Sequence, residues 1–223
     1  MGGQNHQPCR DYLEDSTKLS RAVSVAMACL ETANVELEDA LLQDLYYGTT
    51  NIEGVAESLV DSETALVDAL RQIASLRKKM DKNSYQDLPS LRRLDLDLLR
   101  ERFSADRMID SDSWRVIAGL MQVGGFYAVL DHFETQVSEL ANLTSALRLQ
   151  IQRIRQAAVG GELNFILEEN RPGNIKRLFA KLYTAWSVFK GEFLASSMLS
   201  TELWYAFNGY GSLTEMNKAV HAA

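Results

Sequence analysis

The fold is decided by two neighbouring stretches of sequence, which read STKLSRAVSVAMACLETANVELEDALLQDLYY (residues 16–47) and TNIEGVAESLVDSETALVDALRQIASLRKKM (residues 50–80). In the first, apolar side chains recur at steps of three and four residues, at Leu19, Val23, Ala26, Leu30, Ala33, Leu37 and Leu41. The second carries a similar stripe of Ile52, Val55, Leu59, Leu66, Leu70, Ile73 and Leu76. This spacing puts each set on one face of an α-helix.

Both segments also carry helix-boundary signals. The first helix is predicted to end near Tyr47, because Gly48 follows it and glycine commonly caps helix C-termini. Thr50 and Glu53 match the capping box that begins a helix. Because only a short connection separates the two segments, we expect an antiparallel pair of helices.

The rest of the chain also favours helices, since it contains only three prolines, Pro8, Pro89 and Pro172. A short helix is predicted from Ser90 to about Arg102, although residues 94–98 alternate like a strand. A long helix should run from Trp114 to about Ala158. Its Gly124-Gly125 pair would either bend it or let another helix approach closely.

After the break at residues 171–173, a further apolar stripe indicates a C-terminal helix with Ile175, Phe179, Leu182, Trp186, Phe189 and Phe193 on one face. The predicted fold is therefore all-α. We expect a polar tail over residues 1–10, an elongated antiparallel helical bundle over 11–161 and a smaller aromatic-rich helical subdomain over 162–223.

Composition limits the classes of function. The 223 residues are 46% hydrophobic and 24% charged, as in globular proteins. A net charge of -7 argues against general nucleic-acid binding, which relies on clustered Lys and Arg. The first fifteen residues do not resemble a secretory signal, and no unbroken apolar run is long enough for a membrane span. We therefore expect a cytoplasmic protein in which Cys9 and Cys29 are reduced thiols.

Negative charge is concentrated in one part of the chain. Between Arg21 and Arg71 there are ten carboxylates and no Lys or Arg. We interpret this acidic block as a surface for a protein partner, a basic one in the simplest case. The residues predicted to bind this partner are Glu38, Asp39, Asp44, Glu53 and Glu57. The simplest alternative is internal pairing with Arg148, Arg153 and Arg155 together with ordinary solvation. A role as a metal site or nucleic-acid mimic is a further alternative.

Aromatic residues gather near the C-terminus, where nine of the nineteen lie between Phe179 and Tyr210. The simplest interpretation is an apolar core. Because large aromatic side chains are also enriched at interfaces and in pockets, a binding surface is the alternative. The residues that would line an apolar ligand site or interface are Phe179, Trp186, Phe189 and Trp204.

No catalytic motif accompanies these features. The sequence contains no nucleophile elbow, phosphate-binding loop or Cys/His cluster. His132 is expected to be a partly exposed helix residue with a local hydrogen bond; phosphotransfer is the alternative. We predict a non-enzymatic helical interaction or scaffold protein that needs no metal or cofactor and does not bind nucleic acid. Binding of an apolar small molecule or lipid is the alternative function, and self-association is compatible with either.

Overall fold

The computed structural model describes residues 7–42, 50–80, 95–96, 111–160, 172–210 and 218. Within these ranges, side chains are described for residues 15–36, 54–80, 95–96, 111–156, 174–201, 203 and 218. Of the helix predicted between Ser90 and Arg102, only Asp95 and Leu96 belong to the described residues. The predicted C-terminal cap at Gly48 lies outside them.

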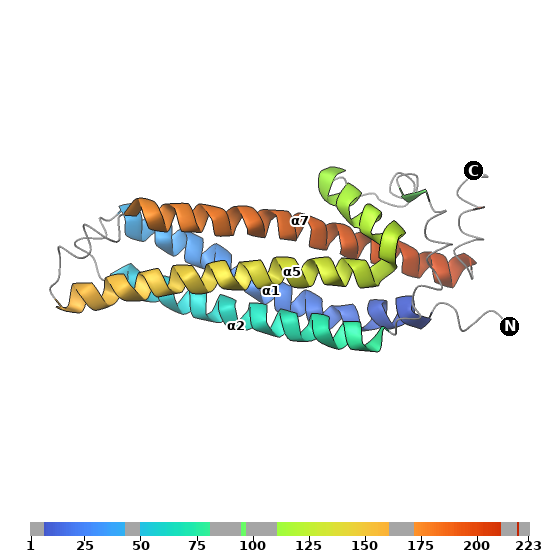
Figure 1. Ribbon diagram of the computed structural model, residues 1–223, viewed down its shortest axis with the longest axis horizontal. Helices are drawn as coiled ribbons and strands as arrows, with labels where there is room; N and C mark the ends of the chain where they lie inside the picture. Colours follow the sequence, from blue (N-terminus) through green and yellow to red (C-terminus); the bar gives the residue numbers. More distant parts are fainter. Residues whose placement is uncertain are drawn as a thin grey trace. The chain divides into compact units, whose positions relative to one another are not determined.

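Four long helices make up the described part of the chain (Figure 1). Their bounds are Gln7–Leu42 for α1, Thr50–Lys79 for α2, Ser111–Gly160 for α5 and Pro172–Tyr210 for α7. Each runs in the direction opposite to the helix before it, so the four pack antiparallel. The all-α class and the long helices predicted for α2 and α5 are confirmed.

Two of the three prolines stand at helix starts. Pro172 is the first residue of α7, and Pro8 is the second residue of α1. Proline is tolerated there because the backbone N–H groups of the first turn have no partner within the helix. This explains why α1 begins at Gln7, with residues 7–10 of the predicted tail forming its first turn.

The chain forms two compact units. Unit 1 is drawn from Met1–Lys18, Gln72–Thr135 and Ser187–Ala223, and unit 2 from Leu19–Arg71 and Gln136–Trp186. Each unit contains a segment of all four helices. The division predicted near residue 161 stays a prediction.

The apolar stripes read from the sequence form the core of unit 2. On α1 and α2 the side chains of Leu19, Val23, Ala26, Leu30, Ala33, Val55, Leu59 and Leu66 are buried. They are joined by Val137, Leu140, Leu147, Ile151 and Ile154 of α5 and by Ile175, Phe179, Leu182 and Trp186 of α7. Hydrophobic burial along all four segments therefore holds this unit together.

In unit 1, α5 bends at Gly125, whose φ of 62° and ψ of -156° are not helical (Figure 1). This backbone conformation is essentially restricted to glycine. Of the two alternatives given for the glycine pair, the structure thus shows the bend. At the neighbouring Gly124, an added Cβ would lie 2.7 Å from the Cβ of Ala128, so this position also lacks room for a side chain.

Helix α5 is also long and apolar enough, over Ser111–Gln156, to cross a membrane by length and composition alone. Its apolar residues include Trp114, Ile117, Met121, Leu130 and Phe133, which are buried against the other helices. Over the most apolar 18-residue window of this helix, 39% is buried. The predicted absence of a membrane span stays a prediction.

Candidate functional site

Unit 2 carries a row of exposed carboxylates on α2, which we call the acidic stripe: Glu57, Asp61 and Asp68. Steps of four and seven residues place all three on one side of the helix. Ser58, next to Glu57, donates a hydrogen bond of 3.0 Å to Glu36 Oε2 of α1. The stripe therefore lies on the outer surface of α2, toward α1.

The environment of Cys29 on α1 agrees with this placement. Burial raises the pKa of the Cys29 thiol above its ordinary value, and the negative charge of Asp61 raises it further. Cys29 is a free cysteine and half-buried. At neutral pH it is consequently a protonated thiol with low nucleophilicity. Helices α1 and α2 also approach closely where Gly54 faces Glu36, since a Cβ added at Gly54 would lie 2.8 Å from Glu36 Oε1.

One carboxylate of the acidic block is neutralised within the protein. Arg148 Nε on α5 donates to Glu63 Oε2 on α2 at 2.8 Å, and each side chain is about one quarter exposed. Arg153, by contrast, is exposed. Among the described side chains, no ion pair joins a residue of the acidic stripe to Lys or Arg. Internal pairing, one predicted alternative, thus accounts for Glu63 and not for the stripe.

The predicted partner-binding residues are only partly described. Glu57 belongs to the acidic stripe. Glu38 and Asp39 lie in α1 and Glu53 lies in α2, but their side chains are outside the described set, as is Asp44 altogether. Asp61 and Asp68 were not among the predicted site residues. The signal that could have found them is their helical register with Glu57.

In unit 1, α5 and α7 share an aromatic cluster of Phe133, Phe189 and Phe193. The Phe133 and Phe189 rings meet edge to face, with centroids 5.6 Å apart, and the Phe193 centroid lies 5.7 Å from that of Phe133. Beside them, His132 Nε2 lies 2.7 Å from Glu192 Oε2. Glu192 is only 6% exposed, so this contact gives a buried carboxyl a polar partner.

The four residues of the predicted apolar site do not all belong to this cluster. Phe179 and Trp186 are buried in unit 2, whereas Phe189 is buried in unit 1. The Trp204 side chain lies outside the described set. The aromatic residues of α7 thus contribute to the apolar core. Their use in an apolar ligand site or interface stays a prediction.

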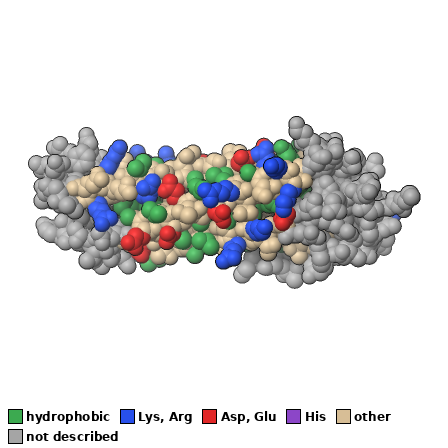
Figure 2. All heavy atoms as spheres, turned by 90° about the horizontal axis from the view of Figure 1, so that it is seen from below, with side chains coloured by type: hydrophobic (Ala, Val, Ile, Leu, Met, Phe, Trp, Pro, Cys, Tyr) green, Lys and Arg blue, Asp and Glu red, His purple; other side chains and the backbone are tan. Residues whose placement is uncertain are grey.

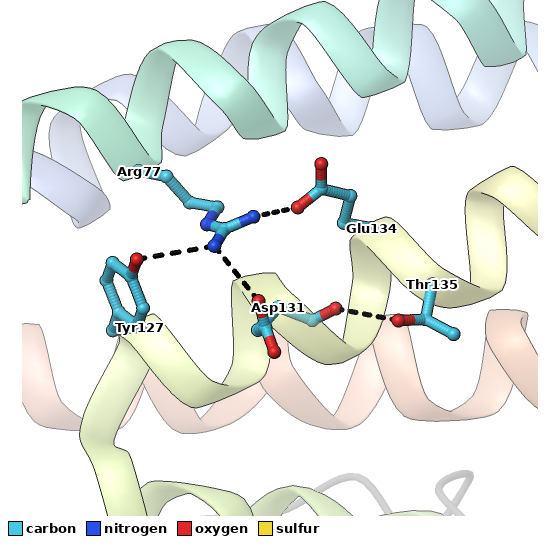
Figure 3. A network of polar contacts seen from close by, with 5 residues as sticks. All are labelled: Arg77, Tyr127, Asp131, Glu134 and Thr135. Carbon is cyan, nitrogen blue, oxygen red and sulfur yellow. Dashed lines mark hydrogen bonds and ion pairs between the residues drawn. The ribbon is translucent and has the colours of Figure 1, made fainter.

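A second polar group in unit 1 is centred on Arg77 of α2 and faces three residues of α5 (Figure 3). Its guanidinium forms ion pairs with Glu134 and with Asp131, the latter at 3.0 Å, and donates to the Tyr127 hydroxyl at 3.3 Å. The guanidinium carbon also lies 5.1 Å from the centre of the Tyr127 ring. This group ties the end of α2 to α5 and suits a structural role.

The chemistry available in the described residues is limited. No group of three His, Cys, Asp or Glu side chains among them could hold a metal ion. The predictions that the protein has no metal, cofactor or catalytic activity are not tested by this finding. Comparisons with protein-family models, curated proteins and solved structures found no match to the chain.

Proposed function

We propose that this protein is a non-enzymatic helical interaction protein that binds a basic protein partner through the acidic stripe. The carboxylates predicted from the sequence, Glu38, Asp39, Asp44 and Glu53, would extend the same surface. The observation that carries the proposal is the contrast between Glu63, which is paired with Arg148, and the exposed acidic stripe beside it.

Repulsion between the carboxylates of the acidic stripe favours binding of a cationic partner. Glu57 and Asp61 are four residues apart on one helix, where two like charges destabilise the helix by about 0.2 to 0.5 kcal/mol. A row of cations on a partner would remove this repulsion. Exposed charges also steer encounter with an oppositely charged protein, so a fast and salt-sensitive association is expected.

The proposal keeps the predicted finer organisation, in which an elongated bundle over residues 11–161 carries a smaller aromatic-rich unit over 162–223. Its support is the concentration of aromatic residues near the C-terminus, where nine of the nineteen lie between Phe179 and Tyr210. In this arrangement the aromatic side chains stabilise the fold, and the charged surface of α2 provides recognition.

The test uses a short Lys- and Arg-rich peptide as the probe in isothermal titration calorimetry. The wild-type chain should bind the peptide at low salt and lose affinity as salt rises, because the Debye length shortens from about 30 Å at 0.01 M to about 8 Å at 0.15 M. Reversal of the acidic stripe by Glu57→Lys, Asp61→Lys and Asp68→Lys should abolish binding.

A matched control reverses three exposed carboxylates outside the stripe, by Glu31→Lys, Asp112→Lys and Glu139→Lys. It changes the net charge by the same amount and should retain most of the affinity. If both triple variants lose affinity equally, only net charge matters, and the proposed site is wrong. Unchanged binding by the stripe variant would have the same consequence.

A further inference from the structure

Within unit 2, negative charge is concentrated on α1 and α2, and positive charge is concentrated on α5 and α7. Its α1 and α2 segments, residues 19–42 and 50–71, carry nine carboxylates and two arginines, a net charge of -7. Its α5 and α7 segments, residues 136–160 and 172–186, carry six Lys or Arg and one Glu, a net charge of +5. One unit thus has an acidic half and a basic half.

The two halves face different sides of the unit. Contacts between Ser58 and Glu36 and between Arg148 and Glu63 order the helices as α1, α2 and α5, and α5 lies between α2 and α7 (Figure 1). We define the basic face as four exposed cations of α5 and α7 in this unit: Arg153, Lys176, Arg177 and Lys181. Arg155 is also exposed, but it follows Arg148 by seven residues and therefore lies on the same side of α5 as Arg148.

Arg153 follows Arg148 by five residues, which is about 140° around a helix of 3.6 residues per turn. Because Arg148 points toward α2, Arg153 points away from α2 and from the acidic stripe. Figure 1 draws α7 and α2 at opposite edges of the bundle, so Arg153 and the three cations of α7 lie away from the acidic stripe. The face of the molecule seen from below exposes acidic, basic and apolar side chains together (Figure 2).

Both surfaces also expose an apolar side chain. Val25 on α1 is 47% exposed. The contact of Glu36 with Ser58 sets the register of the antiparallel pair and brings Val25 level with Asp68. On the other side, Leu149 is 48% exposed and lies one helical turn before Arg153. Each surface thus combines an apolar contact point with charges of one sign.

We propose that the basic partner is a second copy of this chain, whose basic face docks on the acidic stripe. This inference rests on the proposed function and names the partner of the same surface. Three carboxylates meet four cations, and Val25 meets Leu149 among them. Such a contact is heterologous, because two different patches of the same protein meet. Each added copy leaves one stripe and one basic face open, so assembly continues into chains or closes into rings.

The experiment measures self-association by sedimentation velocity over a range of protein concentrations at low and high salt. The wild type should form a series of species above the dimer at low salt and become monomeric at high salt. Reversal of the stripe by Glu57→Lys, Asp61→Lys and Asp68→Lys should weaken self-association by about tenfold to hundredfold, as expected for three exposed ion pairs. Reversal of the basic face by Arg153→Glu, Arg177→Glu and Lys181→Glu should do the same.

The two reversed chains provide a stronger test when they are mixed. Each is expected to be monomeric alone, but the stripe of one now complements the basic face of the other, so the mixture should associate again. A matched control, Lys18→Glu, Lys78→Glu and Arg115→Glu, has the same net charge as the basic-face variant and should associate like wild type. Far-ultraviolet circular dichroism confirms that each variant is folded, and Glu57→Gln, Asp61→Asn and Asp68→Asn replaces the stripe variant if it is not.

A wild type that stays monomeric at low salt overturns the inference, as does a basic-face variant that associates like wild type. Failure of the mixture to associate also overturns it. These results are distinguishable from failure of the proposed function. A monomeric wild type that still binds the Lys- and Arg-rich peptide through the stripe would retain the proposed function and reject only the second copy as the partner.

Discussion

Removal of the Arg77 side chain should destabilise unit 1, because this one group joins α2 to three side chains of α5 (Figure 3). The side chain of Arg77 is 26% exposed, whereas those of Asp131 and Glu134 are 64% and 41% exposed. Solvent therefore screens the two ion pairs. The substitution Arg77→Ala removes all of these interactions together.

The magnitude follows from its parts. A cation over an aromatic ring contributes about 0.5 to 1 kcal/mol at an exposed site, and a hydrogen bond contributes about 0.5 to 1.5 kcal/mol. Partly exposed ion pairs contribute about 0.2 to 1 kcal/mol each. Because contacts that share one guanidinium are not additive, we expect Arg77→Ala to lower the free energy of unfolding by about 2 kcal/mol. In a chain of this length that corresponds to a decrease in Tm of about 4 to 8 °C.

Urea unfolding followed by circular dichroism measures this loss. Arg77→Lys retains the charge and the aliphatic stem but not the planar fork, so it should lose about half as much. Lys78→Ala is the matched control, since Lys78 is the next residue of α2 and is exposed. If Arg77→Ala costs no more than Lys78→Ala, the Arg77 group does not hold α2 to α5, and the reasoning is wrong.

Three further predictions concern the backbone, a surface carboxylate and the thiol. Gly125→Ala should destabilise the protein by about 1 to 3 kcal/mol because the φ of Gly125 is positive. Gly119→Ala, whose added Cβ meets no atom within 4 Å, should be neutral or stabilising by up to about 1 kcal/mol, and urea unfolding measures both changes. The hydrogen bond from Lys79 lowers the pKa of Asp15 below its ordinary value, so Asp15→Asn should be less stable than wild type above the ordinary pKa. In a pH series of unfolding experiments the difference should vanish as pH falls through the lowered pKa, and a difference that persists in acid would contradict this. In a Cys9→Ser background, Asp61→Asn should shift the pH dependence of the Cys29 alkylation rate modestly to lower pH, while burial keeps the pKa of the thiol raised. An unchanged pH dependence would show that the Asp61 carboxylate does not act on the thiol.

Local sequence pattern predicted the helices well because helix formation and helix burial both depend on nearby residues. The stripe from Leu19 to Ala33 repeats every three or four residues and is buried in the structure. Gly125 was a candidate bend from sequence, but its positive φ requires three-dimensional knowledge. The early start of α1 was missed because Pro8 reads as a helix breaker, although it is tolerated in a first turn.

Long-range pairing was harder to predict. The sequence indicated that Arg148 could meet the acidic block, but it did not identify Glu63 as the partner. Neither His132 with Glu192 nor Arg77 with Asp131 and Glu134 has a local signal, since each pair joins residues more than fifty positions apart. Such contacts depend on how two packed helices are rotated and on which residues lie opposite each other. The apolar stripe fixes the buried face of a helix, but it leaves this register uncertain by one or two residues.

The sequence by itself determined the all-α class, the long helices, and the concentration of negative charge between Arg21 and Arg71. These properties follow from residue type and spacing along one helix. Only the tertiary structure decided that Glu63 is paired with Arg148 while Glu57, Asp61 and Asp68 face solvent. Charge adds up along a chain, but whether it is paired depends on which helices lie side by side, and that is fixed by burial of the apolar faces.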